Sequence, residues 1–182
     1  MGGVAAKYLS REDSKVIGFI GAGEQAKMTL AAIKTARPTI NECRVSAKTT
    51  EEEEQFGAEM QALYPDINFV QTNADGQAAV DGADILVTAT SAQAPLLKAA
   101  WMKPGAFYNH VGGWEDEYAV AKQCAKIVCD DWETVKHRTQ TISRMYKDGE
   151  LADDDIYADL PDMVAGDKPG RETDDERTYF NA

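Results

Sequence analysis

The sequence predicts an α/β fold in which a doubly wound parallel sheet of about six strands has the order 3-2-1-4-5-6. Short apolar runs alternate with longer helical patterns along the 182 residues, as in parallel sheets with helical crossovers. The first run, 15–20, is continuously apolar and therefore suits a strand buried on both faces. A glycine-rich turn follows it directly, and a helical pattern follows the turn.

The first half of the chain contains three of the expected strands. They are placed at 15–20, 43–46 and 67–70, with helices over 25–36 and 50–63. In the first helix Ala26, Leu30 and Ile33 fall on one face. The second helix begins with Thr50 and Glu53, which have the spacing of a capping box, and prolines follow both helices.

The second half continues the same alternation. A short crossover helix is expected over 75–81, strands at 84–88, 106–109 and 126–129, and a helix over 134–146. The segment from 148 to 182 holds 12 acidic and 3 basic residues, and we expect it to be mostly irregular. The length predicts one domain covering 1–182.

Composition excludes several classes of function. A net charge of −12 argues against a nucleic-acid partner. No apolar run approaches the ~20 residues that span a bilayer, and the N-terminus has no signal-peptide pattern, so we expect a cytoplasmic protein without a membrane partner. The three cysteines form neither a zinc pattern nor a disulfide framework, and no metal site is expected.

The turn after the first strand carries the clearest functional signal. Gly21-Ala22-Gly23-Glu24-Gln25-Ala26 fits G-x-G-x-x-G/A between a strand and a helix. Gly21 permits the tight turn, Gly23 admits a pyrophosphate close to the backbone, and Ala26 lets the helix pack on the strand. The free N–H groups of the helix would then face the phosphates. This Rossmann-type pattern predicts binding of NAD(H) or NADP(H); the alternative is a packing turn in a protein with another ligand.

The end of the second strand bears on the choice between the two cofactors. An NAD site usually has a carboxylate there to accept from the ribose hydroxyl. Here Ser46, Lys48 and Thr49 occupy this position without a carboxylate. The sequence therefore favours NADP slightly over NAD. The alternative is that Lys48 is an ordinary surface lysine.

The ends of strands four and five should face the nicotinamide half. Thr88 and Thr90 offer hydroxyls there, and Gly112 and Gly113 allow close approach of the backbone. His110, next to the same strand end, is interpreted as a hydrogen-bonded structural residue rather than as an acid or base.

Six segments resemble the ornithine cyclodeaminase and mu-crystallin family over nearly the whole chain. They are Ala5-Ala6-Lys7-Tyr8-Leu9, the loop 21–26, Thr88-Ala89-Thr90-Ser91, Val111-Gly112-Gly113, Val128-Cys129-Asp130-Asp131 and Gly166-Asp167-Lys168-Pro169-Gly170-Arg171. The Gln after the second loop glycine and the closing Pro-Gly-Arg are the more specific marks.

The resemblance implies hydride transfer between a nicotinamide and an amine or imine carbon of a small amino acid or imine substrate. By position, Glu24 and Gln25 would meet the pyrophosphate and the segment 46–49 the adenosine ribose. Thr88 or Thr90, with Val111, Gly112 and Gly113, would flank the nicotinamide.

One departure concerns catalysis. The cyclodeaminase motif places a proton-transferring Asp directly after the paired glycines, where this sequence has Trp114. Glu115 and Asp116 follow, and no catalytic residue is assigned. The sequence thus favours an amino-acid or imine oxidoreductase over a true cyclodeaminase. Its alternatives are a non-catalytic NADPH-dependent ligand-binding protein like mu-crystallin and an interaction module with a structural glycine loop.

A second departure concerns length. The resemblance implies a longer two-domain protein, with an N-terminal substrate and dimerisation segment and a C-terminal helix that this chain lacks. We therefore expect a domain excised from a homodimeric parent. Alone it should bind nucleotide without turning over substrate, and its uncovered apolar faces should favour self-association.

Overall fold

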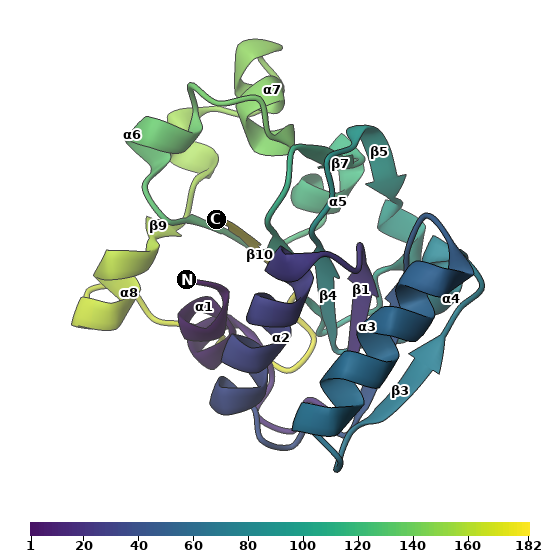
Figure 1. Cartoon of the computed structure of the whole chain (residues 1–182). Helices are drawn as coiled ribbons and strands as arrows, with labels where there is room; N and C mark the ends of the chain where they lie inside the picture. Colours follow the sequence, from purple (N-terminus) through teal and green to yellow (C-terminus); the bar gives the residue numbers. More distant parts are fainter.

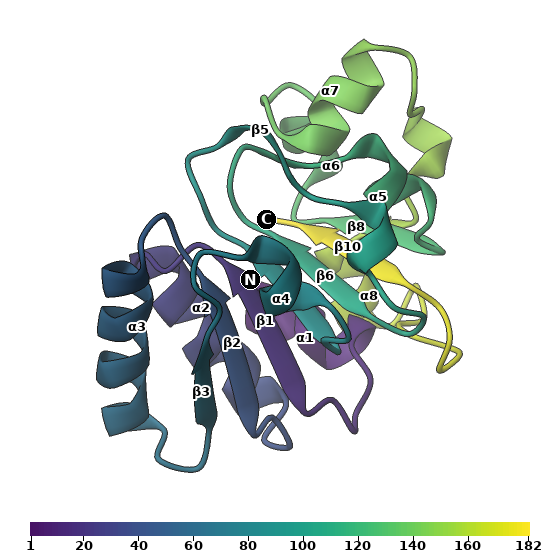
Figure 2. The same cartoon turned by 90° about the vertical axis from the view of Figure 1, so that its right-hand side faces the viewer.

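A parallel sheet with helices on both faces organises the computed structural model, which describes residues 1–182 (Figures 1 and 2). Its strand order is β3-β2-β1-β4-β6-β10-β8-β9, and every neighbouring pair is parallel. The strands are β1 (Val16–Ile20), β2 (Glu42–Ser46), β3 (Asn68–Gln71), β4 (Ile85–Thr88), β6 (Phe107–His110), β8 (Lys126–Cys129), β9 (Ala158–Asp159) and β10 (Thr178–Asn181). Two further strands, β5 (Gln93–Leu97) and β7 (Trp114–Asp116), form a separate pair.

The helices divide between the two faces of the sheet. They are α1 (Gly2–Leu9), α2 (Glu24–Ala36), α3 (Thr50–Leu63), α4 (Gly76–Val80), α5 (Tyr118–Lys122), α6 (Trp132–Val135), α7 (Thr141–Lys147) and α8 (Leu160–Ala165), with 3₁₀ turns at Ala99–Trp101 and Asp153–Asp155. One core cluster packs α1, α2, α3 and α8 on one face, and a second packs α4, α5, α6 and α7 on the other. Burial on both sides explains the continuously apolar strands.

The predicted fold class is confirmed. All six expected strands exist within one or two residues of their predicted bounds, and the helix over 50–63 begins and ends where expected. The helices over 25–36 and 75–81 correspond to α2 and α4. The first five strands also have the expected order, since β3, β2, β1, β4 and β6 are successive neighbours.

The expected position of the sixth strand was wrong. β10 lies between β6 and β8, so the segments predicted as strands five and six do not pair. The segment after 148 was predicted to be mostly irregular, yet it holds β9, α8 and β10. The four residues of β10 are buried, and parallel pairing on both sides satisfies their backbone. Composition did not predict this strand, because the short run that contains Tyr179 and Phe180 lies in a segment rich in charged residues.

Two local predictions were also wrong. The helix expected over 134–146 is divided into α6 and α7, and the side chain of Gln140 at the break donates to the carbonyl oxygens of Gly112 and Ala182. The cap of α3 is Thr49, whose hydroxyl accepts the N–H of Glu52, rather than Thr50. Glu53 therefore does not take part in a capping box with Thr50, and its side chain is fully buried.

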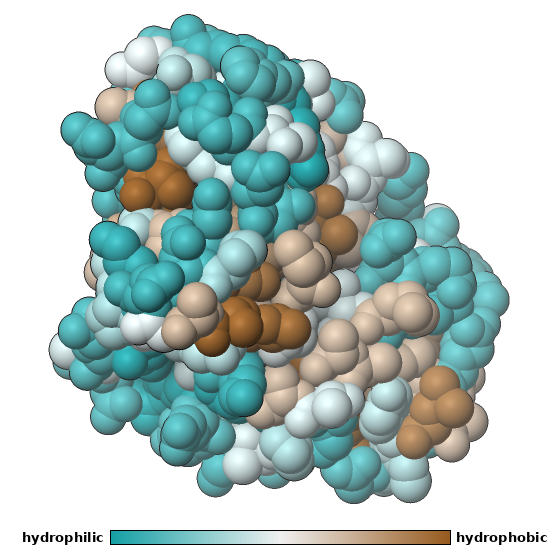
Figure 3. Space-filling model, turned by 90° about the vertical axis from the view of Figure 1, so that its left-hand side faces the viewer, coloured by the Kyte–Doolittle hydropathy of each residue, from teal (hydrophilic) through white to brown (hydrophobic).

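Both chain ends lie beside β6. Gly2 packs against the side chain of Asn109, and the N–H of Ala182 donates to the carbonyl oxygen of His110. The N and C labels lie close together in both cartoon views (Figures 1 and 2). Figure 3 shows apolar groups among hydrophilic ones on the side of α1 and α8, where Val4 and Val164 are exposed. None of the helices has the length and apolar character needed to cross a bilayer.

Candidate functional site

A cavity of about 600 Å³ lies at the carboxyl ends of the central strands. Segments that follow β1, β2, β3 and β4 line most of it, so it occupies the position where open α/β sheets bind ligands. Its lining residues are Ile20, Gly21, Ala22, Gly23, Ser46, Ala47, Lys48, Glu52, Ala74, Gly76, Ala89, Thr90, Ser91, Ala92, Leu96 and Trp101.

Five of the predicted cofactor residues line this cavity, namely Gly21, Gly23, Ser46, Lys48 and Thr90. The structure thus brings together the glycine turn, the end of β2 and the loop after β4. Seven predicted residues do not line it, namely Glu24, Gln25, Thr49, Thr88, Val111, Gly112 and Gly113. Glu24 and Gln25 begin α2, whereas Thr88 is buried behind the cavity wall.

The glycine turn has the geometry that its sequence predicts. Gly21 has φ +109°, and its N–H donates to the carbonyl oxygen of Ser46 over 2.8 Å. A Cβ at Gly21 would lie 2.4 Å from the carbonyl oxygen of Ala89, so only glycine fits between these loops. At Gly23 a Cβ would meet nothing within 4 Å. The turn is therefore closed at Gly21 and leaves open space at Gly23.

The N-terminus of α2 presents unpaired backbone donors at this turn. The N–H groups of Ala22, Gly23, Glu24 and Gln25 donate to no acceptor in the protein. Unpaired donors at the positive end of a 13-residue helix favour a negatively charged group. The carboxylate of Glu24 pairs with Lys27, so the backbone of this turn supplies the free donors.

The end of β2 carries one charge of each sign. Lys48 lines the cavity and forms no ion pair in the structure. Glu52 lines it too, and its carboxylate accepts the N–H of Lys48 over 3.3 Å. The sequence did not predict a carboxylate here, because Glu52 follows the end of β2 by six residues and returns to the cavity only through the first turn of α3.

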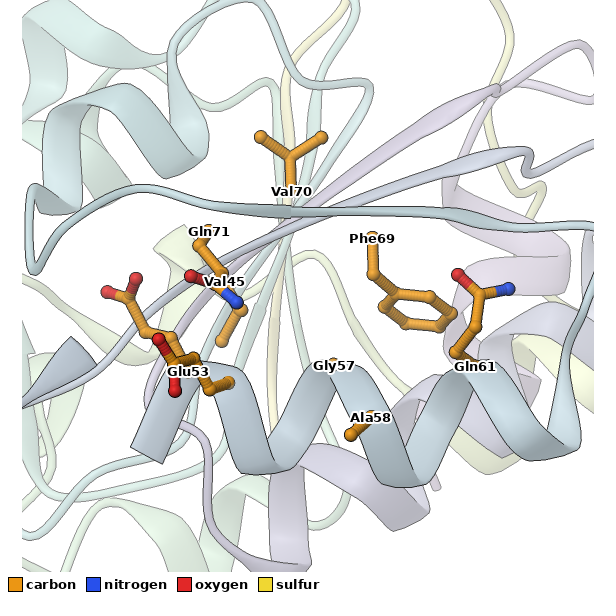
Figure 4. Close-up of a pocket in the computed structure, with 9 residues that line it drawn as sticks. Val45, Glu53, Gly57, Ala58, Gln61, Phe69, Val70 and Gln71 are labelled. Atoms are coloured by element: carbon orange, nitrogen blue, oxygen red, sulfur yellow. The ribbon is translucent and has the colours of Figure 1, made fainter. Parts of the chain in front are cut away.

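A second buried carboxylate supports the same end of the cavity. Glu53 accepts the N–H groups of Ala47, Thr72, Asn73 and Ala74 over 2.7–3.1 Å. Its side chain also borders a smaller cavity of about 280 Å³ between α3 and β3, where Figure 4 shows it on the first turn of α3. Since Ala47 and Ala74 line the main cavity, Glu53 connects two parts of that wall.

Glu115 is a buried carboxylate that holds together the loops at the opposite end of the cavity. Its Oε1 accepts the N–H and the hydroxyl of Thr90, both over 2.5 Å, and its Oε2 accepts the Thr88 hydroxyl and the Gly112 N–H, both over 2.8 Å. Burial raises the pKa of Glu115, and the hydrogen bonds from Thr90, Thr88 and Gly112 oppose that rise. The sequence alone indicates no role for Glu115, because the partners of its carboxylate come from two other segments of the chain.

Asp116 and His110 lie deeper in the same polar cluster, and both are fully buried. Oδ1 of Asp116 accepts the hydroxyl of Thr141 over 2.6 Å, while Oδ2 has no partner, and burial raises the pKa of Asp116 to about 7. Nε2 of His110 donates to the carbonyl oxygen of Gly113, and Nδ1 accepts the hydroxyl of Tyr179. Burial lowers the pKa of His110 to about 4, so it is a neutral structural residue.

The Pro-Gly-Arg segment has a structural role on the far side of the sheet. Arg171 donates to the carbonyl oxygens of Leu9, Thr173 and Glu176 and to the hydroxyl of Thr178. These bonds hold the end of α1 and the start of β10 to one another. The motif therefore contributes to the fold and does not reach the cavity.

The strand order and the cavity at the carboxyl ends define the class of this protein as a Rossmann-type α/β domain. The model of the ornithine cyclodeaminase/mu-crystallin family matches residues 1–182, and the chain belongs to that family. This confirms the resemblance seen in the motifs.

Curated relatives include two kinds of oxidoreductase. Alanine dehydrogenase of Archaeoglobus fulgidus is 33% identical over 186 residues, covering 100% of this chain and 55% of the relative. Delta(1)-pyrroline-2-carboxylate reductase of Bacillus cereus is 31% identical over 188 residues, covering 100% and 56%. The chain thus spans about half the length of the curated relatives it matches.

Solved structures give the same picture. The Delta(1)-pyrroline-2-carboxylate reductase of Thermococcus litoralis, in complex with NADH and L-proline, superposes with a TM-score of 0.93 at 34% identity, covering 98% of this chain and 56% of that one. An archaeal alanine dehydrogenase dimer with bound NAD has a TM-score of 0.91 at 32% identity, covering 100% and 56%. Both of these relatives hold a nicotinamide dinucleotide.

Proposed function

We propose that this chain binds NAD(H) or NADP(H) along the 600 Å³ cavity and forms the cofactor domain of an amino-acid or imine oxidoreductase. The observation that carries the proposal is the group of four unpaired N–H donors at the start of α2. They lie beside the open space at Gly23, so a pyrophosphate fits between the backbone and the cavity. The bound NADH and NAD of the two solved relatives support it.

The proposal gives each group of predicted residues a position. Gly21 shapes the turn, Gly23, Glu24 and Gln25 hold the pyrophosphate through their backbone N–H groups, and Ser46, Lys48 and Thr49 adjoin the adenosine ribose. Thr90 faces the nicotinamide half, with Thr88, Val111, Gly112 and Gly113 behind it. A nicotinamide bound there would supply the hydride donor or acceptor for an amine or imine carbon.

Cofactor preference depends on the two charges at the end of β2. Lys48 attracts a 2′-phosphate, as the sequence indicates, while Glu52 in the same wall repels it. Glu52 can also accept from the 2′-hydroxyl of NAD. We propose that the two side chains together set the cofactor preference. NADP is preferred only if the attraction of Lys48 for the 2′-phosphate exceeds the repulsion by Glu52.

The rest of the oxidoreductase would adjoin the strand ends. Both termini of this chain lie beside β6, close to the carboxyl edge of the sheet. A second domain joined to them would face the cavity and could present substrate to the nicotinamide. We propose a parent of two domains that assembles as a homodimer, as the archaeal alanine dehydrogenase does. Exposed Val4 and Val164 would favour self-association of this domain alone.

One observation favours a second function, the binding of a ligand without turnover. Trp114 occupies the position of the proton-transferring Asp, and the carboxylates of Glu115 and Asp116 after it are fully buried. No carboxyl group of this segment therefore reaches the cavity. A full-length parent that binds NADPH but never oxidises or reduces amino acids or cyclic imines would support this mu-crystallin-like alternative.

A fluorescence titration with NADH and NADPH tests the main proposal. Trp101 lines the cavity, so energy transfer from tryptophan to bound dihydronicotinamide should grow and saturate. Gly23→Val fills the open space at the turn and should weaken binding at least tenfold, whereas Gly57→Ala, in α3, should leave it unchanged. Absence of binding by folded wild-type chain would contradict the proposal.

A further inference from the structure

We propose that two buried glutamates, Glu53 and Glu115, are positioning residues that fix the two ends of the cofactor cavity; the inference rests on the proposed function. Neither side chain is exposed, so neither touches a ligand. Each carboxylate instead accepts four hydrogen bonds from loops that follow different strands. Glu53 holds the adenosine end and Glu115 the nicotinamide end.

At the adenosine end, Glu53 joins the segment after β2 to the segment after β3. It accepts the N–H of Ala47 and three successive N–H groups from Thr72, Asn73 and Ala74. Asn73 and Ala74 have φ of 56° and 61°, in the left-handed region that is unfavourable for a residue with a Cβ. The carboxylate therefore stabilises an unfavourable turn, and this turn places Ala74 in the cavity wall.

At the nicotinamide end, Glu115 joins the segment after β4 to the segment after β6. Thr90 gives both its N–H and its hydroxyl to Oε1, while Gly112 gives its N–H to Oε2. A Cβ at Gly112 would lie 2.5 Å from the Glu115 carboxyl carbon and 2.4 Å from the Thr90 carbonyl oxygen. Gly112 thus makes room for the carboxylate rather than for the cofactor.

The contacts of Glu115 extend to the loop after β4. Thr90 anchors this loop, because both its N–H and its hydroxyl donate to the Glu115 carboxylate. The pair of short strands β5 and β7 places Glu115 beneath this loop, with Gln93 paired to Trp114 and Leu97 to Asp116. A change at Glu115 should therefore move the loop from 89 to 92, which lines the cavity.

Only a carboxylate satisfies these donors. All four groups around each glutamate donate, and a glutamine would turn its own NH₂ toward at least one of them. Buried donors left without an acceptor relax by moving, and the loops that carry them should separate. Glu→Gln is nearly isosteric, so it tests whether the hydrogen bonds to the carboxylate hold the surrounding loops in position.

The two ends can be tested separately with ligands of different length. Calorimetric titrations of the 182-residue chain would compare NADH with ADP-ribose, which lacks the nicotinamide. E115Q should weaken NADH about tenfold, or ~1.4 kcal/mol, and leave ADP-ribose within about twofold. E53Q should weaken both ligands about tenfold, since both need the adenosine end. E54Q, next to Glu53, and E117Q, two residues from Glu115, should change neither affinity; the only protein donor to the Glu117 carboxylate is the N–H of Ala99.

Further variants keep the test open if a glutamine variant does not fold. T88V removes one donor to Glu115 outside the cavity lining and should weaken NADH selectively, whereas T88S keeps the hydroxyl and should not. Adding A74G to E53Q relieves the positive φ and should restore folding while both affinities stay weak.

Several outcomes would overturn the inference. Equal loss of affinity for NADH and ADP-ribose in E115Q would show that Glu115 supports only the overall fold. Unchanged affinities in E53Q would show that Glu53 positions nothing near the ligand. If the wild-type chain binds ADP-ribose as tightly as NADH, the role of Glu115 is refuted, whereas the role of Glu53 is not. A wild-type chain that binds neither would refute the proposed function itself.

Discussion

Gly21 lies directly against the carbonyl oxygen of Ala89, with room for a hydrogen atom but not for a methyl group between them. A Cβ at Gly21 would be 2.4 Å from that oxygen. The contact joins the glycine turn after β1 to the loop after β4, and both loops line the cavity. The shape of the candidate cofactor site therefore depends on a residue with no side chain.

We predict that Gly21→Ala destabilises the chain as well as weakening NADH binding. The substitution combines a φ of +109° with the Ala89 contact, so a loss of about 2–4 kcal/mol in unfolding free energy is expected. Urea unfolding measures the loss. Gly23→Ala, with open space around the new Cβ, is the control and should cost less than about 1 kcal/mol. Equal costs for the two variants would contradict the packing argument.

Cofactor preference should respond to Lys48 and Glu52 in opposite directions. Lys48→Glu should weaken NADPH relative to NADH, and Glu52→Gln should strengthen NADPH relative to NADH, each by roughly 3–10-fold at low salt. Glu51→Gln, in the same helical turn but outside the cavity, is the control. Titrations with both dinucleotides at two salt concentrations provide the test. Parallel changes for NADH and NADPH would show that neither charge reads the 2′ position.

Asp116 should make the protein less stable as pH rises. Burial raises its pKa from 3.8 to about 7 in the folded state, so its favourable contribution is full below pH 3.8 and is lost as pH rises through 7. We expect Asp116→Asn to remove about 5 °C of the decline in Tm between pH 5 and 8.5. Thermal unfolding across this range measures it, with exposed Asp154→Asn as the control. Parallel pH profiles for wild type and Asp116→Asn would contradict the prediction.

Strand β10 should be essential to the sheet although it ends the chain. Phe180 is fully buried in the core that contains α1, α2 and α3. Phe180→Ala should cost about 3–5 kcal/mol of unfolding free energy, because it leaves a cavity in that core. Val164→Ala, at a side chain that is 53% exposed, should cost less than about 0.5 kcal/mol. Similar costs for both would mean that β10 is loosely packed.

The elements that the sequence predicted are those with a local physical cause. β1 is continuously apolar, Gly21 and Gly23 stand between a strand and a helix, and the first helix has one apolar face. These signals lie within a few neighbouring residues, so they identify the fold class and the glycine turn without any knowledge of long-range contacts.

Elements that depend on distant partners were not predictable in this way. β10 has only four residues in an acidic segment, and it is a strand because β6 and β8 both pair with it. The division between α6 and α7 likewise depends on Gln140, whose side chain reaches carbonyl oxygens of Gly112 and Ala182. Local propensity contains no information about such partners.

The sequence by itself thus determined the α/β class, the glycine turn and the family to which the chain belongs. Tertiary structure alone decided which polar residues face the cavity and which support it. Thr90 and Thr88 look alike in sequence, yet one lines the cavity and the other is buried against Glu115. The reason is physical: a buried carboxylate needs donors, and only the folded chain brings together the loops that supply them.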